Sequence, residues 1–312
     1  MIRKIIFGSV IALMGMGCSQ ERTTPGGFKF NVLKKGDGKE LAAGSYLIID
    51  LLVKDSHDST WADTRKDGFP ISTRVQAPGD PSRAKQEGLE AVFRMMSKGD
   101  SVTFSIPAHR FFREMWREPV PKKVDADSHF TFYVKAKDVL DEPRWRKFQQ
   151  EMVNKQNALY LKQQAEQLGK DTVTIDNFLR EKGIKAQTTP LGIRYVITKP
   201  GHGPTGKSGQ IAMVQYKGYL LNGTIFDTNV ESFAKANNLH QRGRLYAPYE
   251  VRIDYTQVIR GWHEMLTKMN AGSTATVYIP STLAYGPQRK SELIKENEIL
   301  VFDLEVLSFK KN

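Results

Sequence analysis

Aromatic residues are concentrated in the C-terminal third of the chain, at places where the local pattern of the sequence changes. They are Tyr216, Phe226, Tyr249, Trp262, Tyr285 and Phe302. Aromatic rings bury large apolar areas, and tyrosine and tryptophan also keep a polar group for hydrogen bonding. Brought together by the fold, these rings can form a dry pocket that binds an apolar group and orients it with a few donors. Trp262 is then either an ordinary core residue or the floor of that pocket.

The usual signatures of covalent, metal or nucleic-acid chemistry do not occur in the sequence. The six histidines show no metal-ligand spacing, and the single cysteine, Cys18, excludes a zinc site built from cysteines. Neither a nucleophile elbow, a P-loop nor a dinucleotide-binding motif appears in its required context. The formal net charge of +12 comes without a run of five basic residues. We therefore expect no metal, no cofactor and no nucleic-acid partner.

The elements that must position the aromatic residues are mostly strands. The segments "IAMVQYKGYL", "TATVYIP" and "ILVFDLEVLSF" are rich in β-branched and aromatic residues. The one helical stretch near them is "GWHEMLTKM", which a stop signal at Gly272 follows. Its residues at helical spacing share one face: Trp262, Met265, Leu266 and Met269. The pattern predicts an α+β fold in which an antiparallel sheet wraps around one short helix.

Similar segments occur twice in the 312 residues. The equivalent residues lie 165 to 173 positions apart: Gly36 and Gly201, Met96 and Met269, Phe132 and Phe302. An offset of that size predicts a duplicated domain, over residues 28–140 and 187–312. Between them, residues 141–186 predict a helical linker, with a Gln/Lys-rich helix that ends at Gly169 and a second short helix after it. The linker either spaces the domains or serves as an arm that binds clients or forms a homodimer.

The N-terminus has the layout of a secretory signal. Arg3 and Lys4 precede an apolar run over residues 5–16, which is too short to span a bilayer, and Cys18 follows it. The segment resembles a bacterial lipoprotein signal, so we expect a signal peptide over residues 1–18 and a lipid on Cys18. Plain secretion is the alternative. The polar residues 19–27 predict a flexible tether, and the expected location is the cell envelope, anchored to a membrane and facing the periplasm or exterior.

Four segments of the second copy together resemble the FKBP-type peptidyl-prolyl cis/trans isomerases. They are "VQYKGYLLNGTIFDT", "VIRGWHEMLTKMNAGS", "IPSTLAYG" and "ILVFDLEVL", and the resemblance covers about residues 190 to 310. With the lipoprotein signal, the two copies further resemble envelope FKBP-type proteins of bacteria. The resemblance implies an enzyme that rotates Xaa-Pro peptide bonds in proteins folding outside the cytoplasm, by binding the twisted amide in an aromatic pocket. The alternative is a membrane-tethered chaperone or scaffold that binds proline-containing segments with little turnover.

The resemblance also implies residue roles. Trp262 is the floor under the prolyl ring, the Ile259 backbone N–H and the Tyr285 hydroxyl are donors, and Asp227 faces the twisted carbonyl unless it is a structural carboxylate. The implied catalytic set is Tyr216, Phe226, Asp227, Ile259, Trp262 and Tyr285, and the implied substrate-binding set is Tyr249, Val258, Ile294 and Phe302. The segments 228–248 and 287–298 depart from the family pattern in length or charge.

The first copy fits the same outline but lacks the site residues. Asp50 is expected at the place of Tyr216, Lys85 and Gln86 at the places of Val258 and Ile259, and Leu89 at the place of Trp262. Trp61 and Asp63 keep only a partial likeness to Phe226 and Asp227, and no tyrosine matches Tyr285. We therefore expect a degenerate domain that binds clients, pairs or spaces.

Overall fold

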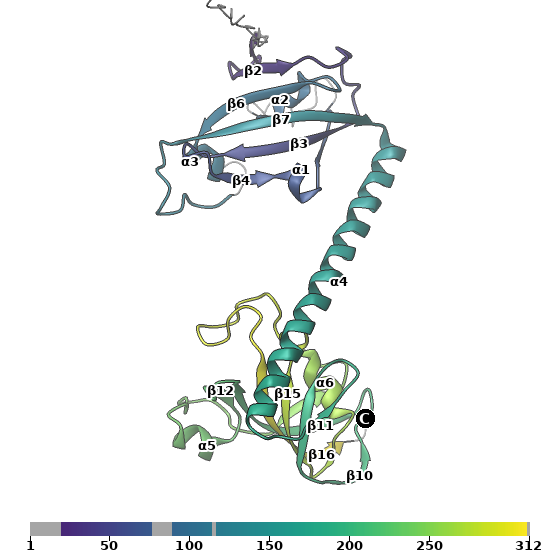
Figure 1. The fold of residues 1–312 in the computed structure, drawn as a ribbon, viewed down its shortest axis with the longest axis vertical. Helices are drawn as coiled ribbons and strands as arrows, with labels where there is room; N and C mark the ends of the chain where they lie inside the picture. Colours follow the sequence, from purple (N-terminus) through teal and green to yellow (C-terminus); the bar gives the residue numbers. More distant parts are fainter. Residues whose placement is uncertain (1–19, 77–88, 114–116, 311–312) are drawn as a thin grey trace, which may run out of the picture. The chain divides into compact units, whose positions relative to one another are not determined.

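The computed structural model describes residues 20–76, 89–113 and 117–310 and divides the chain into two units, residues 1–155 and 156–312 (Figure 1). The expected signal peptide, Cys18, Lys85 and Gln86 lie outside the described residues. Each unit contains a seven-stranded sheet whose strand pairs are antiparallel. Across the described residues, no helix is both long enough and apolar enough to cross a membrane.

Unit 1 has the strand order β1-β2-β6-β7-β3-β4, with β5 paired to β3. Its strands are β1 (Gln20–Thr23), β2 (Lys29–Lys34), β3 (Tyr46–Lys54), β4 (Thr60–Asp63), β5 (Ile71–Arg74), β6 (Ser101–Pro107) and β7 (His129–Leu140). Its helices are α1 (Thr64–Asp67), α2 (Leu89–Arg94) and α3 (Ala108–Phe111).

Unit 2 has the strand order β12-β11-β16-β15-β9-β8, with β13 paired to β11. These strands are β8 (Gln187–Thr188), β9 (Arg194–Lys199), β11 (Ile211–Leu220), β12 (Ile225–Thr228), β13 (Tyr249–Arg252), β15 (Thr274–Ile279) and β16 (Leu300–Lys310). A separate pair is formed by β10 (His202–Thr205) and β14 (Asn270–Ala271). The helices are α5 (Glu231–Ala236), α6 (Arg260–Leu266) and the 3-10 turn η3 (Ser281–Leu283).

The two sheets share one topology, strand for strand. The central strand β3 pairs with β7, and β11 pairs with β16, in the same register. Each pair has an irregularity at the equivalent point, between Ile48 and Ile49 in unit 1 and between Met213 and Val214 in unit 2. The predicted fold class, an α+β architecture with an antiparallel sheet on a short helix, is confirmed. Because the registers match, residues can be compared between the units position by position.

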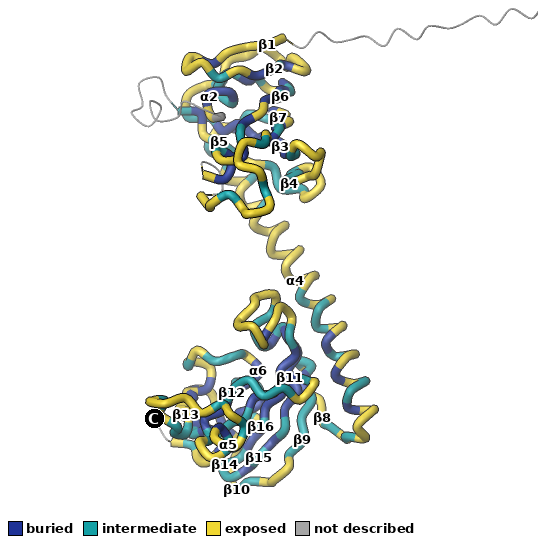
Figure 2. Tube along the Cα trace, turned by 90° about the vertical axis from the view of Figure 1, so that its left-hand side faces the viewer, coloured by how far each residue is buried: buried dark blue, intermediate teal, exposed yellow. Residues whose placement is uncertain are grey.

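The predicted packing face of α6 is the face that packs against the sheet. Trp262, Met265 and Leu266 are buried in the core of unit 2, and so is Met269, although the helix ends at Leu266. Figure 2 shows the buried residues along the strands inside each unit. The spacing of apolar residues therefore identified the core side of the helix correctly. Met269, which follows the helix, is buried in the same core.

The linker differs from its prediction, because one helix, α4 (Glu142–Glu181), replaces the two expected helices. Gly169 was expected to end the first helix, yet it does not adopt a left-handed φ. A glycine inside a helix costs about 1 kcal/mol relative to alanine, and apolar residues beyond it offset that cost. Ile175 and Leu179 are buried in a cluster of unit 2.

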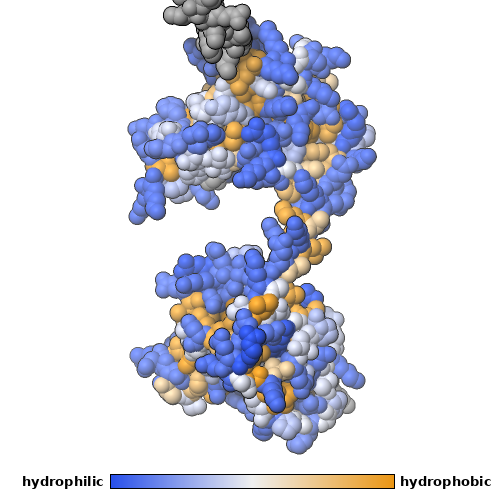
Figure 3. Space-filling model, viewed as in Figure 1, coloured by the Kyte–Doolittle hydropathy of each residue, from blue (hydrophilic) through white to orange (hydrophobic). Residues whose placement is uncertain are grey.

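The two ends of α4 belong to different units. Trp145 stacks on Tyr46 of unit 1 with ring centroids 4.1 Å apart, so the helix starts as part of that unit. Between the ends, apolar side chains remain exposed, among them Val153 and Leu161, and Figure 3 shows such residues among polar ones on α4. The linker predicted for residues 141–186 is thus divided at residue 155.

The described part of the predicted flexible tether is ordered, which corrects that prediction. β1 pairs antiparallel with β2, with Gln20 opposite Val32. Thr24 is buried, and its hydroxyl accepts a hydrogen bond from the backbone N–H of Phe28. The polar composition of this segment suited a tether, but the free edge of β2 provides backbone partners that an isolated segment lacks.

Candidate active site

The fold brings four of the predicted aromatic residues into one cluster at the start of α6. Trp262 and Phe302 are buried, with ring centroids 5.3 Å apart and planes at 88°. Tyr216 lies 5.1 Å from Trp262, and Phe226 lies 5.5 Å from Phe302, both edge to face. Edge-to-face packing is the favourable geometry for aromatic pairs. The cluster therefore forms a rigid apolar wall built from β11, β12, α6 and β16.

Two glycines make this packing sterically feasible. A Cβ on Gly218 would lie 2.6 Å from the ring of Phe226, and a Cβ on Gly261 would lie 2.5 Å from Ile279 Cγ2. Contacts that short do not occur between real side chains and the Cβ of a neighbour. Gly261 thus allows the first turn of α6 to approach β15 closely, which places Trp262 against the sheet.

A polar network borders the cluster. The Tyr216 hydroxyl donates to Asp227 Oδ2 at 2.6 Å, and Arg244 Nη1 donates to Asp227 Oδ1 at 2.7 Å. Arg244 Nη2 also approaches the Tyr216 hydroxyl at 3.3 Å, and the backbone N–H of Thr228 donates to Asp227. Burial, followed by the hydrogen bond to Asp227, raises the pKa of Tyr216 above its ordinary range. Tyr216 therefore remains a neutral donor at physiological pH.

Two further groups of the predicted set carry donors. Ile259 precedes α6 with an extended backbone, and none of the described residues accepts a hydrogen bond from its N–H. Tyr285 follows η3 and is partly buried against the cluster. Burial, and after it the charge of Asp227, raise the pKa of Tyr285. Both groups can donate to a carbonyl oxygen of a bound peptide.

The remaining predicted residues divide into two groups. Val258 and Ile294 pack with the core that holds Trp262, so loop 287–298 contributes a side chain there. Tyr249 is 45% exposed on β13, where it pairs with Val214 across the sheet, and it is not part of the aromatic cluster. The structure therefore does not bring Tyr249 to the predicted pocket wall.

Arg244 is the site residue that sequence reasoning missed. It lies in the segment 228–248, far in sequence from Tyr216, and its guanidinium stands 5.3 Å from the ring centroid of Tyr246. Its contact with Asp227 raises the pKa of Arg244. Buried Asn229 accepts from the backbone N–H of Tyr216 and donates to Ala247 O, which fixes both ends of the segment on β11. No local pattern marks Arg244, because its partner is set by how this segment folds back.

Comparison with known proteins places this geometry in a family. The family model for "FKBP-type peptidyl-prolyl cis-trans isomerase" matches residues 203–307. FK506-binding protein 1 of Candida glabrata is 34% identical over 123 residues, which are 39% of this chain and 96% of that protein. The chain belongs to the FKBP family.

Two bacterial FKBP relatives extend the similarity. The outer membrane protein MIP of Legionella longbeachae is 33% identical over 175 residues, 56% of this chain and 66% of that protein. The probable FKBP-type peptidyl-prolyl cis-trans isomerase FkpA of Neisseria meningitidis is 38% identical over 132 residues, 42% of this chain and 43% of that protein. The chain thus spans less than two thirds of each of these two relatives.

Unit 1 has the same topology as unit 2, but apolar residues stand at the positions where unit 2 has the polar residues of the site. Leu51 pairs with Val134 as Tyr216 pairs with Leu304, which corrects the expectation that Asp50 stands in that place. Asp50 is one residue off and so points to the other side of the sheet, where Lys137 lies 3.5 Å away.

Further positions of unit 1 follow the same trend. Ala62 pairs with Val53 as Asp227 pairs with Gly218, so Asp63 does not match the FKBP aspartate. Instead Asp63 caps α1. Ile106 and Ile279 occupy equivalent register positions, and the sixth residue after each is Phe112 and Tyr285, respectively. The side chain of Leu89 lies outside the part of the chain that the structure describes. At three other positions, an apolar residue of unit 1 replaces Tyr216, Asp227 or Tyr285.

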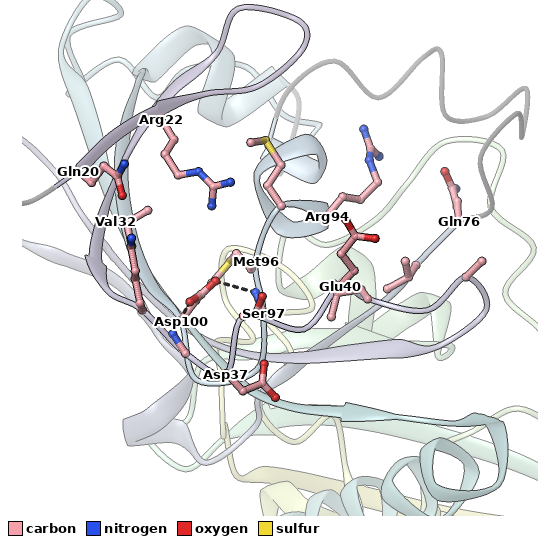
Figure 4. Close-up of a pocket in the computed structure, with 17 residues that line it drawn as sticks. Gln20, Arg22, Val32, Asp37, Glu40, Gln76, Arg94, Met96, Ser97 and Asp100 are labelled. Atoms are coloured by element: carbon pink, nitrogen blue, oxygen red, sulfur yellow. Dashed lines mark hydrogen bonds between the residues drawn. The ribbon is translucent and has the colours of Figure 1, made fainter.

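Unit 1 also contains a polar hollow of about 880 Å³ (Figure 4). Its lining includes Arg94, the last residue of α2, and Met96 just after it, whereas the FKBP cluster lies where α6 begins. Asp100 in its wall already accepts from the backbone N–H groups of Gly36 and Ser97. The hollow is therefore not the counterpart of the aromatic cluster.

Proposed function

We propose that unit 2 is a peptidyl-prolyl cis/trans isomerase that accelerates rotation about Xaa-Pro bonds. The observation that carries the proposal is the combination of a buried Trp262 floor with donors from Ile259 and Tyr285 beside it. The prolyl ring lies on Trp262, and the flanking carbonyl groups face the donors. Family membership supports this assignment, and so does a relative that is named as a probable peptidyl-prolyl cis-trans isomerase.

The reaction explains why the site needs no nucleophile. Rotation about a peptide bond faces a barrier of about 18–20 kcal/mol, and no covalent bond breaks. Twisting removes the amide resonance and with it the charge separation between oxygen and nitrogen. An apolar wall with fixed donors stabilises that state better than water does. Lowering the barrier by about 5 kcal/mol would accelerate rotation nearly four orders of magnitude.

Asp227 orients the polar edge of this pocket. Tyr216 and Arg244 hold its two oxygens, so the carboxylate has one fixed direction relative to the aromatic wall. In the proposal this fixed dipole faces the twisting carbonyl carbon, and the pair with Arg244 prevents a net negative charge from repelling the carbonyl oxygen. The alternative, a purely structural carboxylate, gives Asp227 no effect on turnover.

The enzyme is proposed to act in the cell envelope on proline-containing segments of folding proteins, held by a lipid on Cys18. The signal-like residues 1–18 and a relative named as an outer membrane protein support this location. Replacing Cys18→Ser is expected to move the protein from the membrane fraction to the soluble fraction. If the variant stays with the membranes, the lipid is not the anchor.

Unit 1 is proposed to be a duplicated copy that has lost the isomerase site and binds clients or spaces unit 2. The shared strand order supports duplication. The apolar residues Leu51, Ala62 and Phe112 at the three polar positions support loss of the site. Unit 1 is accordingly expected to contribute no turnover.

A protease-coupled assay on a panel of Xaa-Pro peptides tests the function with the full chain. Wild type is expected to accelerate isomerisation, and Asp227→Ala is expected to lower turnover at least about tenfold without unfolding the protein. Asp303→Ala, at a carboxylate outside the cluster, is a control for loss of any acidic side chain. Peptide binding without acceleration would instead favour the tethered chaperone or scaffold.

A further inference from the structure

A buried carboxylate of α4 reaches the turn that precedes Tyr285. Asp171 is only 3% exposed. Its Oδ2 accepts hydrogen bonds from the backbone N–H of Ser281, at 2.8 Å, and from the Ser281 hydroxyl, at 2.5 Å. Its Oδ1 accepts from Gln167 Nε2 at 2.7 Å. Three donors thus compensate the carboxylate for the water that it loses on burial.

Ser281 transmits this contact to the backbone around Tyr285. It is the first residue of η3 and is fully buried. Its carbonyl oxygen accepts hydrogen bonds from the N–H groups of Ala284 and Gly286, at 2.9 and 2.8 Å. These two residues flank Tyr285 in the chain. The position of the Tyr285 side chain therefore depends on how Ser281 is held.

The requirements of helix docking do not explain the carboxylate. Within unit 2, α4 already packs through Ile175 and Leu179 into an apolar cluster with Tyr278 of β15. Asp176 adds an ion pair in which both oxygens accept from Arg194, at 2.8 and 2.7 Å. Those contacts hold the helix without Asp171, whereas, among the described residues, Asp171 Oδ2 accepts only from the backbone N–H and the hydroxyl of Ser281.

We propose that Asp171 is a positioning residue of the isomerase site, which holds Ser281 so that the Tyr285 hydroxyl meets the substrate carbonyl. This inference rests on the proposed function, because it requires Tyr285 to donate to a bound peptide. It makes the last part of α4 a component of the site. The peptide turnover of unit 2 then depends on a residue outside the segment that matches the family model, residues 203–307.

The test compares six forms of the full chain in the protease-coupled assay: wild type, Asp171→Ala, Asp171→Asn, Asp176→Ala, Tyr285→Phe and the double variant Asp171→Ala with Tyr285→Phe. Asp176→Ala is the matched control, because it removes an α4 carboxylate that is bound to Arg194 of β9 and does not touch η3. Thermal unfolding of each form shows that the comparison is made between folded proteins.

We expect Asp171→Ala to lower kcat about tenfold while KM changes less than about twofold, because the donor is misplaced and the apolar wall is intact. Asp171→Asn keeps an acceptor for Ser281, and Gln167 can rotate its amide, so kcat should stay within about threefold of wild type. Asp176→Ala should retain wild-type turnover. In the Tyr285→Phe background, Asp171→Ala should have no further effect on kcat.

Two results overturn the inference while leaving the isomerase intact: wild-type kcat in Asp171→Ala, or equal loss from Asp171→Ala with and without Tyr285. If Asp171→Ala does not fold, Ser281→Ala replaces it, since that change removes the hydroxyl bond and keeps the backbone bond. If wild type itself gives no acceleration, the proposed function and the inference both fail.

Discussion

The contact between Arg244 and Asp227 is a strong test of the site, because only the three-dimensional structure revealed it. Arg244 Nη1 lies 2.7 Å from Asp227 Oδ1. For unit charges at that distance, Coulomb's law gives an attraction of about 1.5 kcal/mol in water and about 6 kcal/mol at an effective dielectric constant of about 20. The two side chains are 28% and 36% exposed, so solvent screening places the pair near the lower figure. The second bond, from Arg244 to the Tyr216 hydroxyl, compensates part of the entropy of ordering the guanidinium.

We therefore expect a coupling energy of about 1–2 kcal/mol in a double-mutant cycle of Arg244→Met and Asp227→Asn. Methionine keeps most of the apolar stem of arginine, and asparagine keeps the shape of the aspartate. The measurement is urea unfolding of unit 2. Unfolding is monitored by fluorine NMR of protein labelled with fluorotryptophan. Trp262 is the only tryptophan of unit 2, and its resonance is assigned with Trp262→Phe.

The cycle also predicts an order among the variants. Each single variant should lose stability, and the double variant should lose little more than the worse single one. Arg244→Met should in addition lower peptide turnover, since Asp227 and Tyr216 are then less well held. Additive losses with a coupling below about 0.3 kcal/mol would refute the reasoning, because the pair would then be fully screened and unimportant for the site.

Two further predictions concern the packing and the electrostatics around the site. Gly261→Ala should cost about 1–3 kcal/mol, because its Cβ would overlap Ile279. Combined with Ile279→Ala it should cost less than the sum of the two, whereas additivity in urea unfolding would contradict the close approach. Burial, and then the nearby charge of Asp303, raises the pKa of Tyr219 to about 12. Since the folded pKa is raised, its stabilising contribution is present below the unfolded value of about 10 and is lost as pH rises toward 12. Absorbance titration should show one late-ionising tyrosine fewer in Tyr219→Phe, and an unchanged titration would exclude the shift.

The fold could be predicted where local pattern and tertiary packing agree. The spacing of Trp262, Met265 and Leu266 identified the buried face of α6 because the same residues meet the sheet. Gly169 misled the prediction of α4, because packing of the segment beyond it outweighs the local cost of glycine. The strand β1 could not be predicted from its polar residues, because it depends on the free edge of β2.

The site was predictable only as far as residues lie within recognisable segments. The aromatic residues of the cluster stand in strands and in α6, whereas Arg244 lies in a segment whose path the sequence does not reveal. The sequence predicted Asp50 at the position in unit 1 that corresponds to Tyr216, but the residue there is Leu51, one position later. An irregularity between Ile48 and Ile49 sits just before it, and a slip of one residue exchanges the two faces of a strand.

Comparison of the two units separates what the fold needs from what the site needs. In unit 1, Trp61 packs edge to face on Phe112 and Phe130, and its indole N–H donates to Asp55. In unit 2, the indole N–H of Trp262 is buried without a hydrogen-bond partner among the described residues, which costs about 1–3 kcal/mol. One topology therefore forms both with apolar residues at the positions of Tyr216, Asp227 and Tyr285 and with the polar side chains that unit 2 has there. Because the fold forms without those polar side chains, their presence in unit 2 supports the proposal that a ligand meets them there.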